Sequence, residues 1–263
     1  MDKTVIKQSQ TIMIDSSACC NAEYCFSVEK DADLIIKING DKKISLNFDV
    51  EVKNGSLFKM LVINDNNEEV TLHDCYNINQ SCQGIIAYSQ LNNSPINADS
   101  YYRLSGINAS VQVLSVSISS CKKVFNQVTE HLASQTTANI DNYGVVLKDG
   151  FCNMVVKNII SKGYHNCSTH QTNRLLTYDK SATGKILPIL YIDDNEVEAS
   201  HACSLGQPDE NQIYYLQSRG LSYSEALRLI TIGYLLPITK VVDSEEINTI
   251  LKEEIESKVQ INV

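Results

Sequence analysis

Residues 197–206, V-E-A-S-H-A-C-S-L-G, are followed by residues 207–236, Q-P-D-E-N-Q-I-Y-Y-L-Q-S-R-G-L-S-Y-S-E-A-L-R-L-I-T-I-G-Y-L-L, and the hydrophobic period changes sharply between them. Up to Gly206 the period is two, which is typical of a β-strand and places His201, Cys203 and Leu205 on one face. From Pro208 onward the apolar residues recur at helical spacing. The chain is therefore predicted to leave its last strand and enter a helical region.

Helix start and stop signals divide that region into a hairpin. Pro208 is predicted at the first helical position, with the acidic Asp209 and Glu210 in the first turn. Gly220 is a stop signal, and Ser222 with Glu225 forms a capping box that opens a second helix through about residue 235. Pro237 closes that helix. A third helix is expected beyond it, with Asp243 and Glu246 as a capping box and an apolar stripe of Ile247, Ile250, Leu251, Ile255 and Val259.

Upstream of residue 197 the pattern is that of β-strands. The segment 44–52 alternates strictly between apolar and polar residues, and Asn-Gly pairs at 39–40 and 54–55 indicate tight turns beside it. Further strands are predicted at 34–38, 57–63, 69–72, 84–88, 101–104, 111–118, 144–147, 153–159 and 186–192. The segment 119–133 has loose helical spacing, and residues 1–30 carry weak signals. Pattern alone leaves a sandwich, a barrel and a solenoid open.

Composition excludes several classes of function. The chain has 263 residues and a net charge of −9, which argues against nucleic-acid binding. No apolar run is long enough for a membrane helix, and charges at Asp2, Lys3 and Lys7 predict that no signal peptide is present. Nine scattered cysteines without zinc-site spacing indicate reduced thiols. We therefore expect a cytoplasmic protein.

Five short segments resemble the SufB/SufD family of iron–sulfur cluster assembly proteins. They are S-H-A-C-S-L-G-Q at 200–207, Q-I-Y-Y-L-Q-S-R-G-L at 212–221 followed by Glu225-Ala226, and, upstream, T-N-R-L-L at 172–176 with P-I-L-Y-I at 188–192. The resemblance implies a mainly β fold, a right-handed parallel β-helix with a C-terminal helical domain, and it favours a strand within 119–133. The expected division is an N-terminal segment at 1–30, a β-helix core at 31–206 and a helical domain at 207–263.

The resemblance also implies a site at the end of the β-helix. His201 matches the SufD histidine that faces SufB, which makes it a candidate ligand for iron in a transient iron–sulfur cluster at the complex interface, with no cluster bound stably by the chain alone. Cys203 shares its strand face. SufB carries His-Glu at this motif, but Ala202 follows His201 here, and no cysteine stands in the 172–174 segment. The resemblance is therefore to SufD, whereas Ala199 stands where SufD proteins often have cysteine.

Partners follow from the same resemblance. The chain would be a non-catalytic scaffold subunit that pairs with a SufB-like protein and binds a SufC-like ATPase. The candidate SufC-binding residues are Tyr214, Tyr215, Arg219, Leu227, Ile230 and Tyr234. No phosphate-binding glycine loop or nucleophile elbow is present, so we expect no enzyme activity.

Two alternatives stay open. One is a stand-alone, homodimeric SufB/SufD-like scaffold that holds its own cluster. The other is a β-solenoid binding protein or carbohydrate enzyme outside the SUF system. An enzyme of that kind would need paired carboxylates, for which Asp193 and Asp194 are the nearest candidates.

Overall fold

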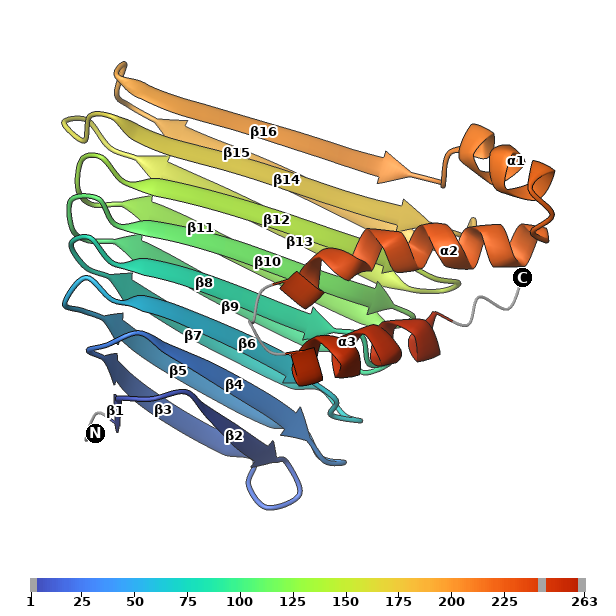
Figure 1. Cartoon of the computed structure of the whole chain (residues 1–263), viewed down its shortest axis with the longest axis horizontal. Coiled ribbons are helices and arrows are strands. Elements are labelled where there is room, and N and C mark those ends of the chain that lie inside the picture. The colour runs from blue at the N-terminus through green and yellow to red at the C-terminus, as the bar shows by residue number, and fades with distance from the viewer. Residues whose placement is uncertain (1–3, 241–244, 260–263) are drawn as a thin grey trace.

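Within residues 4–240 and 245–259, which the computed structural model describes, sixteen strands wind into a parallel β-solenoid, and three α-helices follow at its C-terminal side (Figure 1). Odd-numbered strands form one eight-stranded sheet and even-numbered strands form the other, and every pairing within them is parallel. The predicted mainly β, parallel solenoid with C-terminal helices is confirmed.

The odd sheet consists of β1 (Thr4–Ile6), β3 (Asn21–Val28), β5 (Ile44–Val52), β7 (Val70–Ile78), β9 (Ile96–Leu104), β11 (Lys122–His131), β13 (Phe151–Ile160) and β15 (Thr183–Ile192). The even sheet consists of β2 (Gln10–Asp15), β4 (Ala32–Asn39), β6 (Leu57–Asn64), β8 (Gln83–Gln90), β10 (Ser110–Ser119), β12 (Thr137–Val146), β14 (Cys167–Thr177) and β16 (Val197–Gly206). Strands β1 to β3 place most of the first 30 residues in the two sheets. The segment 119–133 is largely strand β11, as the resemblance implies.

Side chains alternate between inward and outward positions along each strand, and the inward ones fill the interior between the two sheets. In β5 every second residue from Ile44 to Val52 is buried, and the residues between them are more accessible. The turn signals are also correct, because Gly40, Asn54 and Gly55 all have positive φ. These turns do not close antiparallel hairpins, since each one passes the chain from one sheet to the other.

The described C-terminal helices are α1 (Glu210–Ser218), α2 (Tyr223–Leu235) and α3 (Glu245–Lys258), with a 3-10 turn, η1 (Leu236–Lys240), after α2. Helices α2 and α3 lie against the outer face of the even sheet, whereas α1 lies beyond the end of β16 and packs on α2 (Figure 1). Leu235, Leu251 and Ile255 are fully buried in one cluster with apolar residues of the even strands. Burial of this stripe, rather than helix propensity, holds the helices in place.

Local signals set the helix ends. The capping box of Ser222 and Glu225 is present at the start of α2, and Gly220, with φ of 97°, ends α1 as predicted. The predicted start of α1 at Pro208 is wrong, because Asp209 is the N-cap and accepts a hydrogen bond from the Asn211 amide. An aspartate side chain satisfies an amide that proline cannot.

Part of the prediction for the third helix lies outside the described residues. This applies to the proposed capping box of Asp243 and Glu246 and to the side chain of Ile247. Of the remaining apolar stripe, Leu251, Ile255 and Val259 are buried, whereas Ile250 is 39% exposed. The stripe therefore packs on the solenoid through its second half.

Candidate functional site at the open end of the solenoid

Strands β15 and β16 form an end of the solenoid that no further rung covers within the described residues (Figure 1). Each has one neighbour in its sheet, β13 and β14 respectively, so each presents an unpaired backbone edge. Residues of β16 are mostly exposed, whereas those of β14 beneath it alternate between buried and more accessible. Exposed strand edges readily pair with another chain.

His201, Cys203 and Leu205 lie on the inward row of this last rung. Register places them above Gln171, Asn173 and Leu175, and all three of those residues are buried. Because side chains at paired positions of parallel strands share a face, the row on β16 continues the interior column of the solenoid. It is exposed only because no rung lies above it, and Leu205 is 51% exposed.

The facing strand β15 adds apolar side chains to this end of the solenoid. Register places Ile186 above the buried Met154 and Leu190 above the buried Asn158, so these two side chains continue the interior row of the odd sheet. Leu187 and Tyr191 lie on the outward row of β15 and are 53% and 57% exposed. An end face of this kind combines apolar area with unpaired strand edges, and it suits association with another folded surface.

The interior below Cys203 contains a polar column that the sequence did not reveal. Ser115 donates to Asn142 Oδ1, and the Asn142 amide donates at 2.7 Å both to Gln127 Oε1 and to Asn173 Oδ1. The Asn173 amide nitrogen in turn lies 3.9 Å from Cys203 Sγ. A hydrogen-bonded row of buried side chains thus ends at the thiol on the open end.

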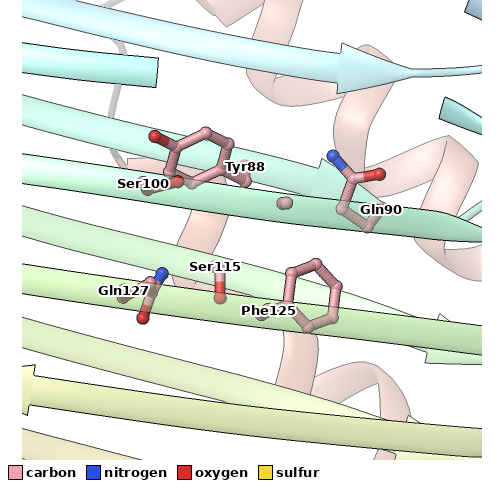
Figure 2. A pocket seen from close by; sticks show the side chains of 7 residues that line it. Tyr88, Gln90, Ser100, Ser115, Phe125 and Gln127 are labelled. Atoms are coloured by element: carbon pink, nitrogen blue, oxygen red, sulfur yellow. The ribbon is translucent and has the colours of Figure 1, made fainter. Parts of the chain in front are cut away.

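A small cavity lies at the lower end of this column. Tyr88, Gln90, Ser100, Ser115, Phe125 and Gln127 surround it, and Figure 2 shows their side chains from both sheets. Its volume is about 10 Å³, which is close to the minimum that one water molecule needs.

An aspartate and three tyrosines form a buried cluster next to the cavity. The Tyr88 hydroxyl donates to Asp74 Oδ2 at 2.5 Å, and the Tyr76 hydroxyl donates to the same oxygen at 3.2 Å. Tyr102 donates to the Tyr88 hydroxyl at 3.1 Å, and its ring stacks on Tyr76. Burial raises the pKa of Asp74 to about 6, although hydrogen bonds from Ser100, Tyr88 and Tyr76 oppose the shift.

The structure separates the other residues that the sequence singled out. In the α1–α2 hairpin, Tyr214 and Tyr215 are 74% and 56% exposed, and the Arg219 guanidinium lies 5.3 Å from the centre of the Tyr215 ring. Leu227 is buried within the hairpin, and Tyr234 packs edge-on against Tyr143 of β12.

Ile230, the last of these residues, is half-buried and lines an open groove. The groove has a volume of about 370 Å³ and is otherwise lined by Asn211, Gln212, Tyr215 and Leu216. The accessible face of the hairpin is therefore built mainly from α1 and the side of α2 next to it.

Two other candidate arrangements do not form a site. Asp194 accepts hydrogen bonds from the amides of Gly163 and Glu196, so its carboxylate organises turns instead of facing Asp193 across a groove. Among the described residues, no three histidine, cysteine or acidic side chains are placed to hold a metal ion. His201 and Cys203 together offer two donor atoms.

Comparison with known proteins gives the family. The model described as "SUF system FeS cluster assembly, SufBD core domain" matches residues 10–234. The chain belongs to the SufBD family of the SUF system. SufBD proteins are iron–sulfur cluster assembly proteins, so the resemblance seen in the sequence is confirmed. No helix within the described ranges is long and apolar enough to cross a membrane.

Several curated SufBD relatives match part of the chain. The iron–sulfur cluster assembly protein SufD of Bacillus subtilis is 36% identical over 123 residues, which are 44% of this chain and 28% of that protein. A SufBD family protein of Mycobacterium leprae is 29% identical over 132 residues, 49% of this chain and 15% of the relative. One of Staphylococcus aureus is 30% identical over 87 residues, 32% and 19% of the two chains. The matched part thus spans less than a third of each relative.

Proposed function

We propose that the chain is the SufD-like, non-catalytic subunit of an iron–sulfur cluster assembly scaffold. It would pair with a SufB-like protein through the open end of the solenoid and bind a SufC-like ATPase through the α1–α2 hairpin. The observation that carries the proposal is the uncovered last rung, where His201 and Cys203 stand in a row on an edge strand. The similarity to a protein named SufD supports the choice of subunit.

The open end suits an interface at which a cluster is built. Its two unpaired strand edges can extend both sheets into a partner, and its apolar residues would be buried by the pairing. Imidazole and thiolate are both ligands for iron. Since His201 and Cys203 give two donor atoms, the cluster would be shared cargo, with its remaining ligands supplied by the partner.

The hairpin suits a second, separate interface. Tyr214, Tyr215 and Leu229 are exposed on it, and aromatic side chains are common at the centres of protein interfaces. The hairpin follows directly after β16, so a partner that holds α1 could act on the rung that carries His201. ATP-driven movement of a SufC-like protein would in this way reach the assembly site.

Co-expression with SufB-like and SufC-like proteins tests both interfaces. We expect the wild-type chain to co-purify with both proteins. Leu205→Glu buries a charge in the end face, so it should lose the SufB-like partner and keep the SufC-like one. The double variant Tyr214→Ala, Leu229→Glu should lose the SufC-like partner and keep the SufB-like one. Each variant must first show an unchanged melting temperature.

Two outcomes would contradict the proposal. One is that the wild-type chain captures neither partner. The other is that each variant, although folded, loses both partners together, because that would mean there is one shared surface. Sedimentation of the chain alone distinguishes the homodimeric alternative, in which the same Leu205→Glu change would convert a dimer into a monomer.

Cluster retention tests the role of His201. After anaerobic incubation with ferrous iron and sulfide, we expect the chain alone to lose its iron on desalting, because it supplies too few ligands. The complex with the SufB-like protein should retain iron and sulfide, and His201→Ala should lower that content at least about threefold. His170→Ala, on the outward face of β14, is the control. Equal retention by the wild-type complex and the His201→Ala complex would exclude a ligand role for His201.

A further inference from the structure

Helix α3 packs on the solenoid through its apolar stripe and through one acidic side chain (Figure 1). Leu251, Ile255 and Val259 are buried in the cluster that includes Ile63 of β6. Glu254 lies three residues after Leu251 and one before Ile255, so it shares this side of the helix and is half-buried. Its carboxyl group is therefore part of the contact between α3 and the solenoid.

The partner of Glu254 in this contact is a second carboxyl group. Asp65 lies in the turn directly after β6, and its side chain forms a hydrogen bond with that of Glu254. Two carboxyl groups form such a bond only when one of them carries a proton, because an ionised carboxylate is an acceptor only. Glu254 Oε1 is buried, and no N–H or O–H group of the described residues donates to it. The contact is thus suited to a protonated Glu254 and is unfavourable for an ionised one.

Two lysines lie near the carboxyl pair of Asp65 and Glu254. Lys123 of β11 is fully buried, and its ammonium group donates at 2.6 to 3.1 Å to the carbonyl oxygens of Gln90 and Asn92. These oxygens hold Lys123 inside the solenoid. Lys258 is exposed in the last turn of α3, one turn beyond Glu254.

The effects of burial and of the second carboxylate outweigh those of the lysines. Burial and the nearby Asp65 raise the pKa of Glu254 to about 7, although the charges of Lys258 and Lys123 oppose the shift. The nearest cation of α2, Arg228, is directed elsewhere and donates to the backbone carbonyl of Glu256 at 3.1 Å.

We propose that the carboxyl pair is a proton-dependent switch, which holds α3 on the even sheet while one proton is shared and loosens the helix when both groups are ionised. Loosening would uncover part of the apolar cluster to which Leu251 and Ile255 belong. The inference goes beyond the proposed function, because it concerns neither the open end of the solenoid nor the α1–α2 hairpin.

The raised pKa of Glu254 sets the sign of the pH dependence. With α3 detached, this carboxyl group is in water and returns to its ordinary pKa of 4.5. The contribution of the carboxyl pair to the docking of α3 is therefore complete below pH 4.5 and is lost as the pH rises through about 7. Between pH 5.5 and pH 7.5 the equilibrium constant for detachment should increase about twentyfold.

Hydrogen–deuterium exchange of the full chain tests the inference without any partner. Peptides that cover 245–258 are followed by mass spectrometry from pH 5.5 to pH 7.5, and each rate is divided by the intrinsic exchange rate at that pH. The wild type should lose about twentyfold in protection over this range. Glu254→Gln should change less than about threefold, because its amide donates to Asp65 at every pH. Asp65→Asn is the second variant and should flatten the profile in the same way.

Glu253→Gln is the matched control. Glu253 is the exposed neighbour of Glu254 on α3, so the substitution removes the same charge from the same helix without touching the contact. It should keep the pH dependence of the wild type. Three results would overturn the inference: a flat profile in the wild type, a wild-type profile in both Glu254→Gln and Asp65→Asn, or a profile flattened equally by Glu253→Gln.

Discussion

Replacing Tyr102 by alanine should lower the free energy of unfolding by about 4 kcal/mol, because a fully buried aromatic side chain is lost from a packed interior. The ring of Tyr102 stacks on Tyr76 with centroids 5.4 Å apart, and its hydroxyl donates to Tyr88. The cavity left behind would remove the packing contact with Tyr76 and the hydrogen bond to Tyr88. For a chain of this size, we expect the melting temperature to fall by roughly 8 °C or more.

Its neighbour Tyr101 is the matched control. It lies on the opposite face of β9 and is 46% exposed, so Tyr101→Ala should change the free energy of unfolding by less than about 1 kcal/mol. Urea and thermal unfolding followed by circular dichroism give both values. Similar losses for Tyr101→Ala and Tyr102→Ala would contradict the inward position of Tyr102 and the register of β9.

Asp74→Asn should stabilise the protein at neutral pH. The pKa of Asp74 is raised from 3.8 to about 6 in the folded state, chiefly by burial. Its contribution to stability is therefore complete below pH 3.8 and is lost as the pH rises through about 6, because the buried carboxyl must then ionise. The loss between these limits is about 3 kcal/mol.

Asparagine stays neutral across that range. At pH 7.5 we expect Asp74→Asn to exceed the wild type in free energy of unfolding by up to about 3 kcal/mol, and the difference should vanish near pH 4. Asp49→Asn, on the outward row of β5, controls for simple loss of a carboxylate. Urea unfolding midpoints of the wild type and both variants, measured from pH 4 to pH 8, test this prediction. Parallel pH curves for the wild type and Asp74→Asn would show that Asp74 titrates normally.

Local signals in the sequence predicted the elements that depend on local physics. The alternation from Ile44 to Val52, the capping box at Ser222 and the stop at Gly220 each depend on neighbouring residues only, and each is present. Parallel winding is different, because pairing between distant strands leaves no local trace. It was predicted from the resemblance of a few motifs, not from the residue pattern.

Strands whose inward positions carry polar residues were the hardest to predict. The strand predicted at 144–147 covers only the end of β12, because Asn139, Asp141 and Asn142 have the composition of a loop, yet Asn142 is buried in the column. The rung repeat was also hidden, since bonded pairs such as Ser115–Asn142 and Asn142–Asn173 are 27 and 31 residues apart.

The sequence predicted where some of the candidate site residues lie. The position of His201 and Cys203 on one face of the last strand followed from period two, and the structure places both at the open end. Their relation to Asn173 could not be predicted, because it depends on the register between β14 and β16. Exposure of the hairpin residues likewise depends on how α2 packs, which separates the buried Leu227 from the exposed Tyr214.

The apolar cluster beneath the helices extends from Ile35 of β4 to Leu176 of β14, so α2, η1 and α3 together connect the even strands along their outer face. In a solenoid without such a connection each rung contacts only its neighbours, and each turn can unfold almost independently. Because the helices cover only one side, this solenoid should lose order first along its odd sheet, while the even strands unfold together. A force applied to the α1–α2 hairpin would then reach many turns at once, and the solenoid would move as a rigid body.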